Sequence, residues 1–138
     1  MIRRQHNPSA IWPVPQSFQN IYSHAVEFIG PGKLLFISGQ IGISPNGAVL
    51  EKFSDQCIQA MANIEAILAS VDFSVADILR VNYFLTDPVH LPELAEIRRV
   101  RWGQFKPPAV TTIVVAALAR ADLLVEIEAT AGTSTTIK

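Results

Sequence analysis

The hydrophobic and polar positions at the start of the chain predict an irregular segment followed by a β-hairpin. Residues 1–20 contain three prolines, which favour an extended, irregular backbone. Residues 23–29 alternate weakly between apolar and polar side chains, and residues 33–40 are rich in apolar, β-branched and aromatic ones. The sequence Gly30-Pro31-Gly32 between them is typical of a turn, so the two segments are expected to pair as strands.

Two helices are predicted in the middle of the chain. Ser54 is a residue type that often caps a helix, and Gln56 and Asn63 behind it fall largely outside the apolar positions. Those apolar positions recur every three or four residues and form one stripe, which consists of Cys57, Met61, Ile64, Leu68 and Val71. A second helix is predicted to begin near Pro92, which suits a first helical turn, and to end before Pro107-Pro108.

Three further strands complete the predicted order, β-β-α-β-α-β-β. They are expected at residues 77–86, 109–117 and 123–130, where β-branched or alternating residues dominate. This order predicts an α+β sandwich in which both helices pack on one face of the sheet. The apolar run at residues 113–115 is typical of a strand that is buried on both faces. Because two helices can cover only one face, we expect the other face to contact another subunit.

Composition limits the function classes. A chain of 138 residues that is 49% hydrophobic is expected to form a single domain. Its net charge of −1 argues against a nucleic-acid-binding surface, and its longest apolar run is too short to span a membrane. The single cysteine, Cys57, lies on the predicted apolar stripe and is interpreted as a buried hydrophobic residue. No disulfide can form within the chain, so a cytoplasmic protein is expected.

The chemistry-bearing residues form no familiar metal or phosphate motif. The histidines, His6, His24 and His90, lie in separate segments and are interpreted as surface or loop residues, so no metal site is predicted. Glu126 and Glu128 flank one residue of a predicted strand, so both carboxylates should point the same way. They belong either to a solvated face, the commoner case, or to a cleft in which a raised pKa would let one of them transfer a proton.

Several segments resemble motifs of the RidA/YjgF family of reactive-intermediate deaminases. They are residues 21–26 (Ile-Tyr-Ser-His-Ala-Val), residues 35–41 (Leu-Phe-Ile-Ser-Gly-Gln-Ile), Pro108-Ala109 and residues 123–129 (Leu-Leu-Val-Glu-Ile-Glu-Ala). Their joint order and spacing make the resemblance specific. It implies a single RidA-like domain over residues 1–138 with a chorismate-mutase-like fold, in which two helices pack on one face of a mixed sheet. It also implies a homotrimer that binds small molecules in clefts between subunits.

The resemblance also implies an activity and part of a site. The family hydrolyses reactive imines and enamines, such as 2-aminoacrylate and 2-iminobutanoate, to 2-keto acids and ammonia without a cofactor. In this sequence Glu126 matches the catalytic glutamate that positions or deprotonates water. Tyr22, Ser38 and Gly39 match residues that orient the substrate.

Three positions depart from the family pattern. Val110 replaces the arginine that binds the substrate carboxylate, and Thr112 replaces a cysteine that lines the same pocket. The second helix carries Arg98 at the position of a family asparagine, although a shift of one residue would make it Arg99. The tract around Arg98 could attract an anion, or it could form a solvated helix face with surface ion pairs.

These departures leave several hypotheses open. Arg98 could supply the missing cation for a deaminase that acts on a non-standard substrate. Alternatively, Val110 could leave a neutral pocket in a non-catalytic trimer that binds a small ligand or a protein partner. An RNA-cleaving translation inhibitor is a third hypothesis, which the net charge of −1 and the absence of a histidine pair disfavour.

Overall fold

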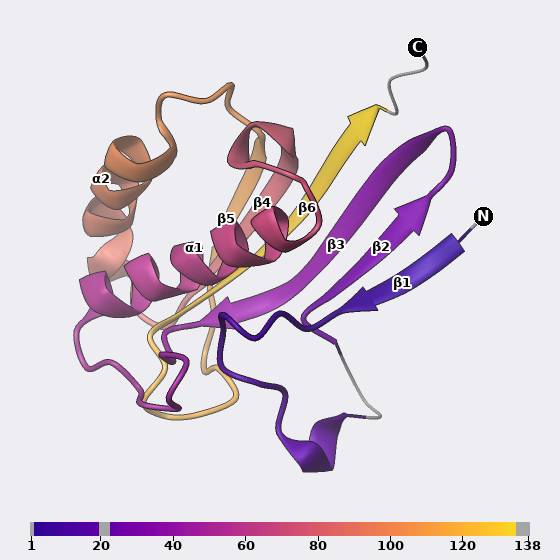
Figure 1. Cartoon of the computed structure of the whole chain (residues 1–138). Coiled ribbons are helices and arrows are strands. Elements are labelled where there is room, and N and C mark those ends of the chain that lie inside the picture. Colours follow the sequence, from indigo (N-terminus) through magenta and orange to yellow (C-terminus); the bar gives the residue numbers. More distant parts are fainter. Residues whose placement is uncertain (1, 20–22, 135–138) are drawn as a thin grey trace.

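A six-stranded mixed sheet carries both helices on one face (Figure 1). The computed structural model describes residues 2–19 and 23–134. The strand order is β1-β2-β3-β6-β4-β5, and all neighbouring strands are antiparallel except β4 and β5. The elements are β1 (Ile2–His6), β2 (Ala25–Ile29), β3 (Gly32–Ile41), α1 (Phe53–Ser70), β4 (Ile78–Leu85), α2 (Leu91–Trp102), β5 (Ala109–Val114) and β6 (Val125–Ser134). The predicted α+β class and both helices are confirmed.

The N-terminal segment differs from the prediction because it begins with a strand. β1 pairs antiparallel with the outer edge of β2, and the irregular backbone starts only after His6. The His6 imidazole lies 2.9 Å from a carboxylate oxygen of Glu27 on β2. This pairing joins residues that are far apart in the sequence, so the local hydrophobic pattern could not reveal it. The predicted hairpin of β2 and β3 is confirmed.

The core lies between α1 and the sheet. Four residues of the predicted stripe, Cys57, Met61, Ile64 and Leu68, are buried, whereas Val71 follows the helix and is half-buried. Ser54 does not cap α1, because the helix begins at Phe53 and no side chain caps it.

Gln56 and Asn63 are also buried, against prediction. The amide nitrogen of Gln56 donates to the backbone carbonyls of Leu50 and Asp122, and its amide oxygen accepts from the backbone N–H of Leu124, each at 2.8 Å. A polar side chain can be buried here because it satisfies three backbone groups of neighbouring loops.

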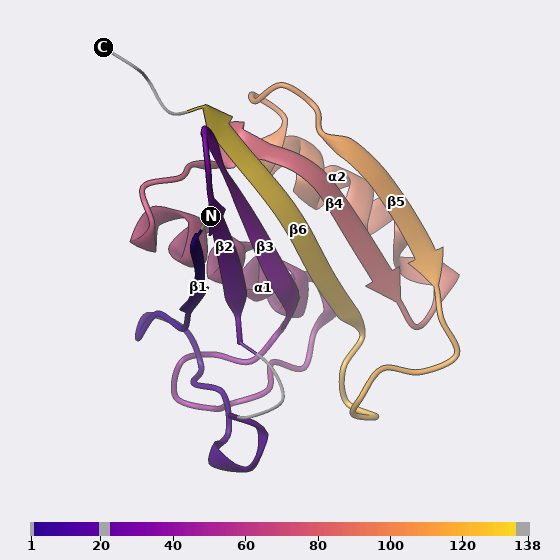
Figure 2. The same cartoon turned by 90° about the vertical axis from the view of Figure 1, so that its right-hand side faces the viewer.

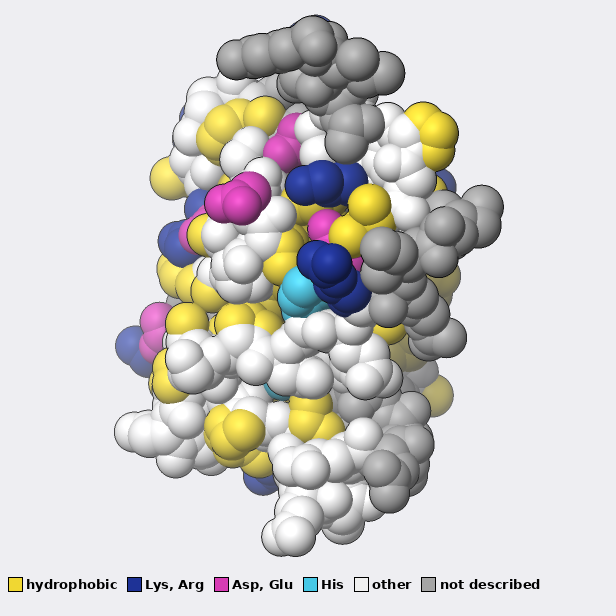
Figure 3. All heavy atoms as spheres, turned by 45° about the vertical axis from the view of Figure 1, so that its right-hand side comes forward, with side chains coloured by type: hydrophobic (Ala, Val, Ile, Leu, Met, Phe, Trp, Pro, Cys, Tyr) yellow, Lys and Arg dark blue, Asp and Glu magenta, His cyan; other side chains and the backbone are white. Residues whose placement is uncertain are grey.

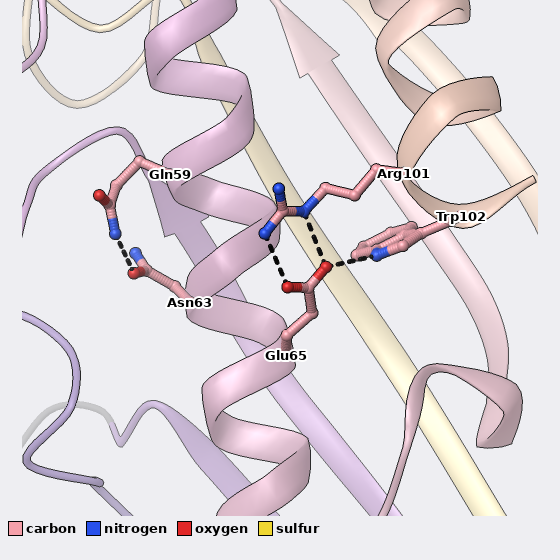
Figure 4. A network of polar contacts seen from close by, with 5 residues as sticks. All are labelled: Gln59, Asn63, Glu65, Arg101 and Trp102. Carbon is pink, nitrogen blue, oxygen red and sulfur yellow. Dashed lines mark hydrogen bonds and ion pairs between the residues drawn. The ribbon is translucent and has the colours of Figure 1, made fainter.

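A single carboxylate joins the two helices. Glu65 on α1 accepts two hydrogen bonds from the Arg101 guanidinium, at 2.7 and 2.8 Å, and one from the Trp102 indole at 2.9 Å (Figure 4). These contacts matter for the position of α2, because Leu94 is the only residue of that helix that is fully buried. Glu65 therefore fixes the C-terminal end of α2 against α1.

The opposite face of the sheet carries no helix (Figure 2). It exposes the large apolar side chains Leu34, Phe36, Leu79 and Ile113, with Phe36 48% and Ile113 45% accessible. In the single chain the run at residues 113–115 is not buried on both faces, because Ile113 and Val114 are exposed. That another subunit covers this face stays a prediction. In the part of the chain that the structure describes, no helix is both long and apolar enough to cross a membrane.

Candidate functional site

Five of the predicted site residues line two separate cavities: Ser38, Gly39 and Glu126 line one, and Arg98 and Val110 line the other. The first, which we call the Glu126 cavity, has a volume of about 570 Å³ and lies between the N-terminal segment, β3 and the start of β6. Its lining is mostly apolar and comprises Trp12, Pro15, Phe18, His24, Ser38, Gly39, Gln40, Ile41, Ile43, Asn63, Ala119, Arg120, Leu123 and Glu126.

Glu126 reaches this cavity because of the alternation in β6 and an irregularity in β3. Val125 and Ile127 are buried against the helices, so Glu126 points to the opposite side of the sheet. The register of β3 against β6 shifts between Ile37 and Gln40. At this bulge a Cβ atom on Gly39 would lie 2.7 Å from Cδ of Glu126. The absence of a side chain at Gly39 therefore lets the carboxylate lie against the backbone of β3.

The environment of Glu126 favours its protonated form. Burial raises the pKa of Glu126 above its ordinary value, and the neighbouring charge of Glu128 raises it further. Among the described residues, the Glu126 carboxylate has no hydrogen-bond or ion-pair partner. By contrast, Glu128 accepts a hydrogen bond of 2.9 Å from the Asn82 amide. The two glutamates share one face of the sheet, as predicted, but only Glu126 is left available for a substrate or a water molecule.

Polar contacts hold the bulge next to Glu126. The Ser38 hydroxyl donates to the backbone carbonyl of Ser23 at 2.5 Å, so in this structure Ser38 fixes the backbone. The Gln40 amide donates to Nδ1 of His24 at 3.1 Å, and Nε2 of His24 lies 2.9 Å from the Trp12 carbonyl. This pattern requires a neutral imidazole with its proton on Nε2, and burial lowers the pKa of His24 accordingly. His24 lies in the loop before β2, as one half of the prediction had it, but it is buried and so is not a surface residue.

The second cavity, which we call the Arg98 cavity, lies between α2 and the strands β4 and β5. Its volume is about 410 Å³, and it is lined by Tyr83, Ala95, Arg98, Arg99, Trp102, Gly103, Phe105, Pro107, Pro108 and Val110. The Arg98 guanidinium lies over the Tyr83 ring, 4.8 Å from its centroid. Burial raises the pKa of the Tyr83 phenol to about 12, so it stays neutral at physiological pH.

The three arginines of α2 have different partners. Arg99 forms an exposed ion pair with Glu96 at 2.6 Å, and Arg101 binds Glu65 at 2.7 Å. Within residues 2–19 and 23–134, the Arg98 guanidinium has no carboxylate partner. The prediction of surface ion pairs therefore holds for Arg99, whereas Arg101 forms a half-buried ion pair between the two helices. Arg98 is hydrogen-bonded to the Tyr83 side chain, and no described carboxylate neutralises its charge.

Within one chain, Val110 of the Arg98 cavity and Glu126 of the other cavity point to opposite sides of the sheet. Val110 is in register with the buried Val81 and faces the helices, whereas Glu126 is in register with Phe84 on the opposite side. Their linings have no described residue in common. One chain therefore does not bring Arg98 or Val110 next to Glu126.

The remaining predicted site residues are easily placed. Thr112 is half-buried on β5, in register with Tyr83, and lines neither cavity in the part of the chain that the structure describes. Tyr22 lies outside the described residues. Cys57 is buried, and this burial raises the pKa of its thiol to about 12, which agrees with its predicted role as a hydrophobic residue.

Sequence reasoning predicted only Ser38, Gly39 and Glu126 among the residues that line the Glu126 cavity. Trp12 and Phe18 form part of its apolar wall, and Arg120, whose guanidinium is 3.0 Å from Asp122, also lines it. The sequence offered one signal for this wall: Trp12 and Phe18 are large aromatic residues in a proline-rich segment, and neither was predicted to lie in the core. No group of three or more metal-ligating side chains lies together among the described residues.

Comparisons with known proteins agree on one family. The model of the family described as endoribonuclease L-PSP matches residues 15–133. A RutC family protein of Aquifex aeolicus is 39% identical over 111 residues, which cover 78% of this chain and 86% of the relative. A RutC family protein of Pyrococcus horikoshii is 36% identical over 112 residues, which cover 80% of this chain and 85% of the relative.

Solved structures share the whole fold. The Rid protein YyfA of Yersinia pestis has a TM-score of 0.86 and 27% identity, with 96% of this chain and all of that chain covered. Escherichia coli TdcF, whose name describes a reactive intermediate deaminase, was solved with bound serine. That structure has a TM-score of 0.84 and 26% identity and covers 95% of this chain and 99% of that one.

Proposed function

Because the chain belongs to the endoribonuclease L-PSP family, which is also called RidA/YjgF, we propose that it hydrolyses a reactive imino or enamino acid to a 2-keto acid and ammonia. The observation that carries this proposal is the half-buried Glu126 carboxylate, which has no hydrogen-bond or ion-pair partner among the described residues and lies against the bulge at Gly39. The serine bound to TdcF supports a small amino-acid-like ligand. We also propose that the protein is cytoplasmic. Because Val110 replaces the expected arginine, we propose that its substrate is not one of the standard short imino acids.

The proposed reaction is general base catalysis by Glu126. Its carboxylate accepts a proton from a water molecule while the water oxygen attacks the imine carbon, and then passes this proton to the imine nitrogen. In the tetrahedral amino alcohol that results, the carboxylate transfers the hydroxyl proton to the amino group, which leaves as ammonia while the carbonyl of the keto acid forms. An enamine is first protonated at carbon and loses a proton from nitrogen, which gives the imine. The raised pKa of Glu126 suits this role because a general base works best when its pKa lies nearer to the operating pH.

The proposed site is completed between subunits of a homotrimer. The uncovered sheet face exposes Phe36 and Ile113, and apolar surfaces of this kind mark interfaces. The Arg98 and Glu126 cavities lie apart in one chain, and Arg120, the arginine that lines the Glu126 cavity, is paired with Asp122. We therefore assign the cation that binds the substrate to Arg98 of a second subunit. In this arrangement Arg98 of one subunit binds the substrate carboxylate by charge-assisted hydrogen bonds, and Glu126 of the next positions water.

Hydrolysis of an imine generated in solution tests the proposal. An amino-acid oxidase supplies the imino acid, and the release of keto acid is compared with and without the protein. We expect acceleration by the wild-type protein and a loss of about 10²–10⁴-fold in Glu126→Gln. Glu51→Gln, which changes an exposed glutamate outside both cavities, should keep the wild-type rate. Full activity in Glu126→Gln would contradict the mechanism.

A non-catalytic binding module is the second candidate, and Val110 is the observation that favours it. A valine cannot form the two-pronged contact with a carboxylate that arginine provides. This candidate predicts that a ligand binds to the cavity that Val110 lines and that no imine tested is hydrolysed faster than in water.

RNA cleavage, which the family description names, has less support from this chain. The net charge is −1, and on the face drawn in Figure 3 the lysine and arginine side chains form small groups beside acidic ones. Nucleic-acid affinity depends mainly on a basic surface that releases counterions from phosphates. We therefore rank this activity below the other two.

A further inference from the structure

The Arg98 cavity combines one cation with an apolar wall. Trp102, Phe105, Pro107, Pro108 and Val110 contribute aromatic rings, proline rings and a branched side chain to it. Arg98 is half-buried above Tyr83, and Arg99, the other basic residue in the lining, is engaged by Glu96. A ligand that fits this cavity therefore carries one negative charge next to a bulky apolar group.

The apolar wall is held in place before any ligand binds. The Trp102 indole N–H donates to Glu65, which is itself held by Arg101, so the position of the ring is fixed (Figure 4). Pro107 and Pro108 have restricted backbone angles. A wall that is already ordered costs little conformational entropy on binding, so apolar contacts with it translate efficiently into affinity.

Position 110 decides how much of this cavity a substrate can occupy. Val110 faces the helices and lines the cavity below the Pro107-Pro108 pair. An arginine in its place would extend a long charged side chain into the same space. Valine leaves that space open and apolar. Arg98 then provides the positive charge of the cavity.

We propose that the cavity selects 2-imino acids with a large apolar side chain, of the aromatic or branched aliphatic class, over short ones. This inference rests on the proposed function and specifies its substrate. The carboxylate of the substrate binds Arg98, and its side chain packs against Trp102 and the proline pair. The imine carbon then points away from α2, toward the Glu126 carboxylate of the neighbouring subunit.

Binding of stable 2-keto acids tests this selection without catalysis. Titration calorimetry on the intact assembly would compare phenylpyruvate and 4-methyl-2-oxopentanoate with pyruvate. We expect the two larger acids to bind at least ~10-fold more tightly than pyruvate, because one or more additional apolar groups in a fitted pocket give discrimination of this size. The same order should be found in Glu126→Gln, which removes hydrolysis and leaves the Arg98 cavity intact.

Substitutions distinguish the contribution of the Arg98 charge to binding from the contribution of the apolar wall. Arg98→Met should weaken all three acids ~10-fold or more, and Arg98→Lys, which keeps the charge, should retain measurable binding and so exclude misfolding as the cause. Val110→Arg should reverse the preference in favour of pyruvate. Arg4→Met, which removes an exposed arginine from β1 at the other edge of the sheet, should bind like the wild type.

Two outcomes would overturn the inference: pyruvate binding as tightly as phenylpyruvate, or unchanged affinities in both Arg98→Met and Val110→Arg. Failure of the proposed function looks different. In that case the larger acids bind as expected, but the imino acids derived from phenylalanine and leucine are hydrolysed no faster than in water.

Discussion

Gly39 on β3 and Glu126 on β6 are in contact. A single methyl group added at position 39 is therefore expected to disturb Glu126. In Gly39→Ala the new Cβ atom would overlap the Glu126 carboxylate, whose side chain can swing away. We expect the variant to fold and to lose imine hydrolysis by about 10²-fold, because the general base is displaced. Gly32→Ala, in which the new Cβ would meet only the Thr133 carbonyl at 3.2 Å, is the control. Wild-type activity in Gly39→Ala would show that the position of Glu126 is not critical.

Glu126 should also reduce the stability of the protein above acidic pH. Since burial raises its pKa in the folded state, folded protein binds the proton more tightly than unfolded protein, and the free energy of unfolding falls as pH rises above the unfolded-state pKa. Glu126→Gln should therefore be more stable than wild type at pH 7, and this advantage should shrink below about pH 4.5, where both states are protonated. Urea unfolding at the two pH values measures the difference. A variant that is less stable at neutral pH would contradict this assignment.

At the scale of elements, α1 depends on one buried amide. Gln56→Ala would leave two carbonyls and one N–H of the adjoining loops without their partner. We expect the free energy of unfolding to fall by about 2–4 kcal/mol, because buried backbone groups without partners are costly. Gln59→Ala on the same helix loses only a hydrogen bond to Asn63 and should change stability by less than about 0.5 kcal/mol. Equal effects of the two variants in denaturant unfolding would refute the role of Gln56.

The hydrophobic pattern predicted the helices and strands whose structure is determined by residues close together in the sequence. The stripe from Cys57 to Leu68 fixed α1, Pro92 marked the start of α2, and the alternation around Ile127 fixed the buried side of β6. β1 was missed because its partner strand lies about twenty residues away and nothing local requires it. Gln56 was assigned to the polar side of α1 because only the folded loops reveal what it bonds to.

The sequence predicted the direction of some side chains of the candidate site, but it did not predict how these residues lie relative to one another. Alternation placed Glu126 and Glu128 on one side of β6, and the structure agrees. That Val110 faces the helices follows from the parallel pairing of β5 with β4, which depends on the crossover through α2 and on the register. Sequence motifs carry neither of these, so they could not show that Arg98 and Glu126 lie apart.

At the scale of the whole molecule, the uncovered sheet face should control assembly. We expect light scattering to give about three times the chain mass of 15.1 kDa for the wild type. Phe36→Glu introduces a charge at the centre of this face and should lower the mass to that of one chain and abolish hydrolysis. Val89→Glu alters a residue that is 68% exposed outside the sheet and should leave the assembly unchanged. A trimer that persists in Phe36→Glu would place the interface elsewhere.

The separation of the Arg98 and Glu126 cavities within one chain has a genetic consequence. Chains with Arg98→Met and chains with Glu126→Gln should each be inactive alone, yet each still carries the half that the other has lost. After co-expression, random assembly into trimers would unite an intact Arg98 with an intact Glu126 in about a quarter of the clefts. Two dead alleles should therefore complement each other and restore roughly that share of the wild-type rate, whereas sites contained in single chains would give none.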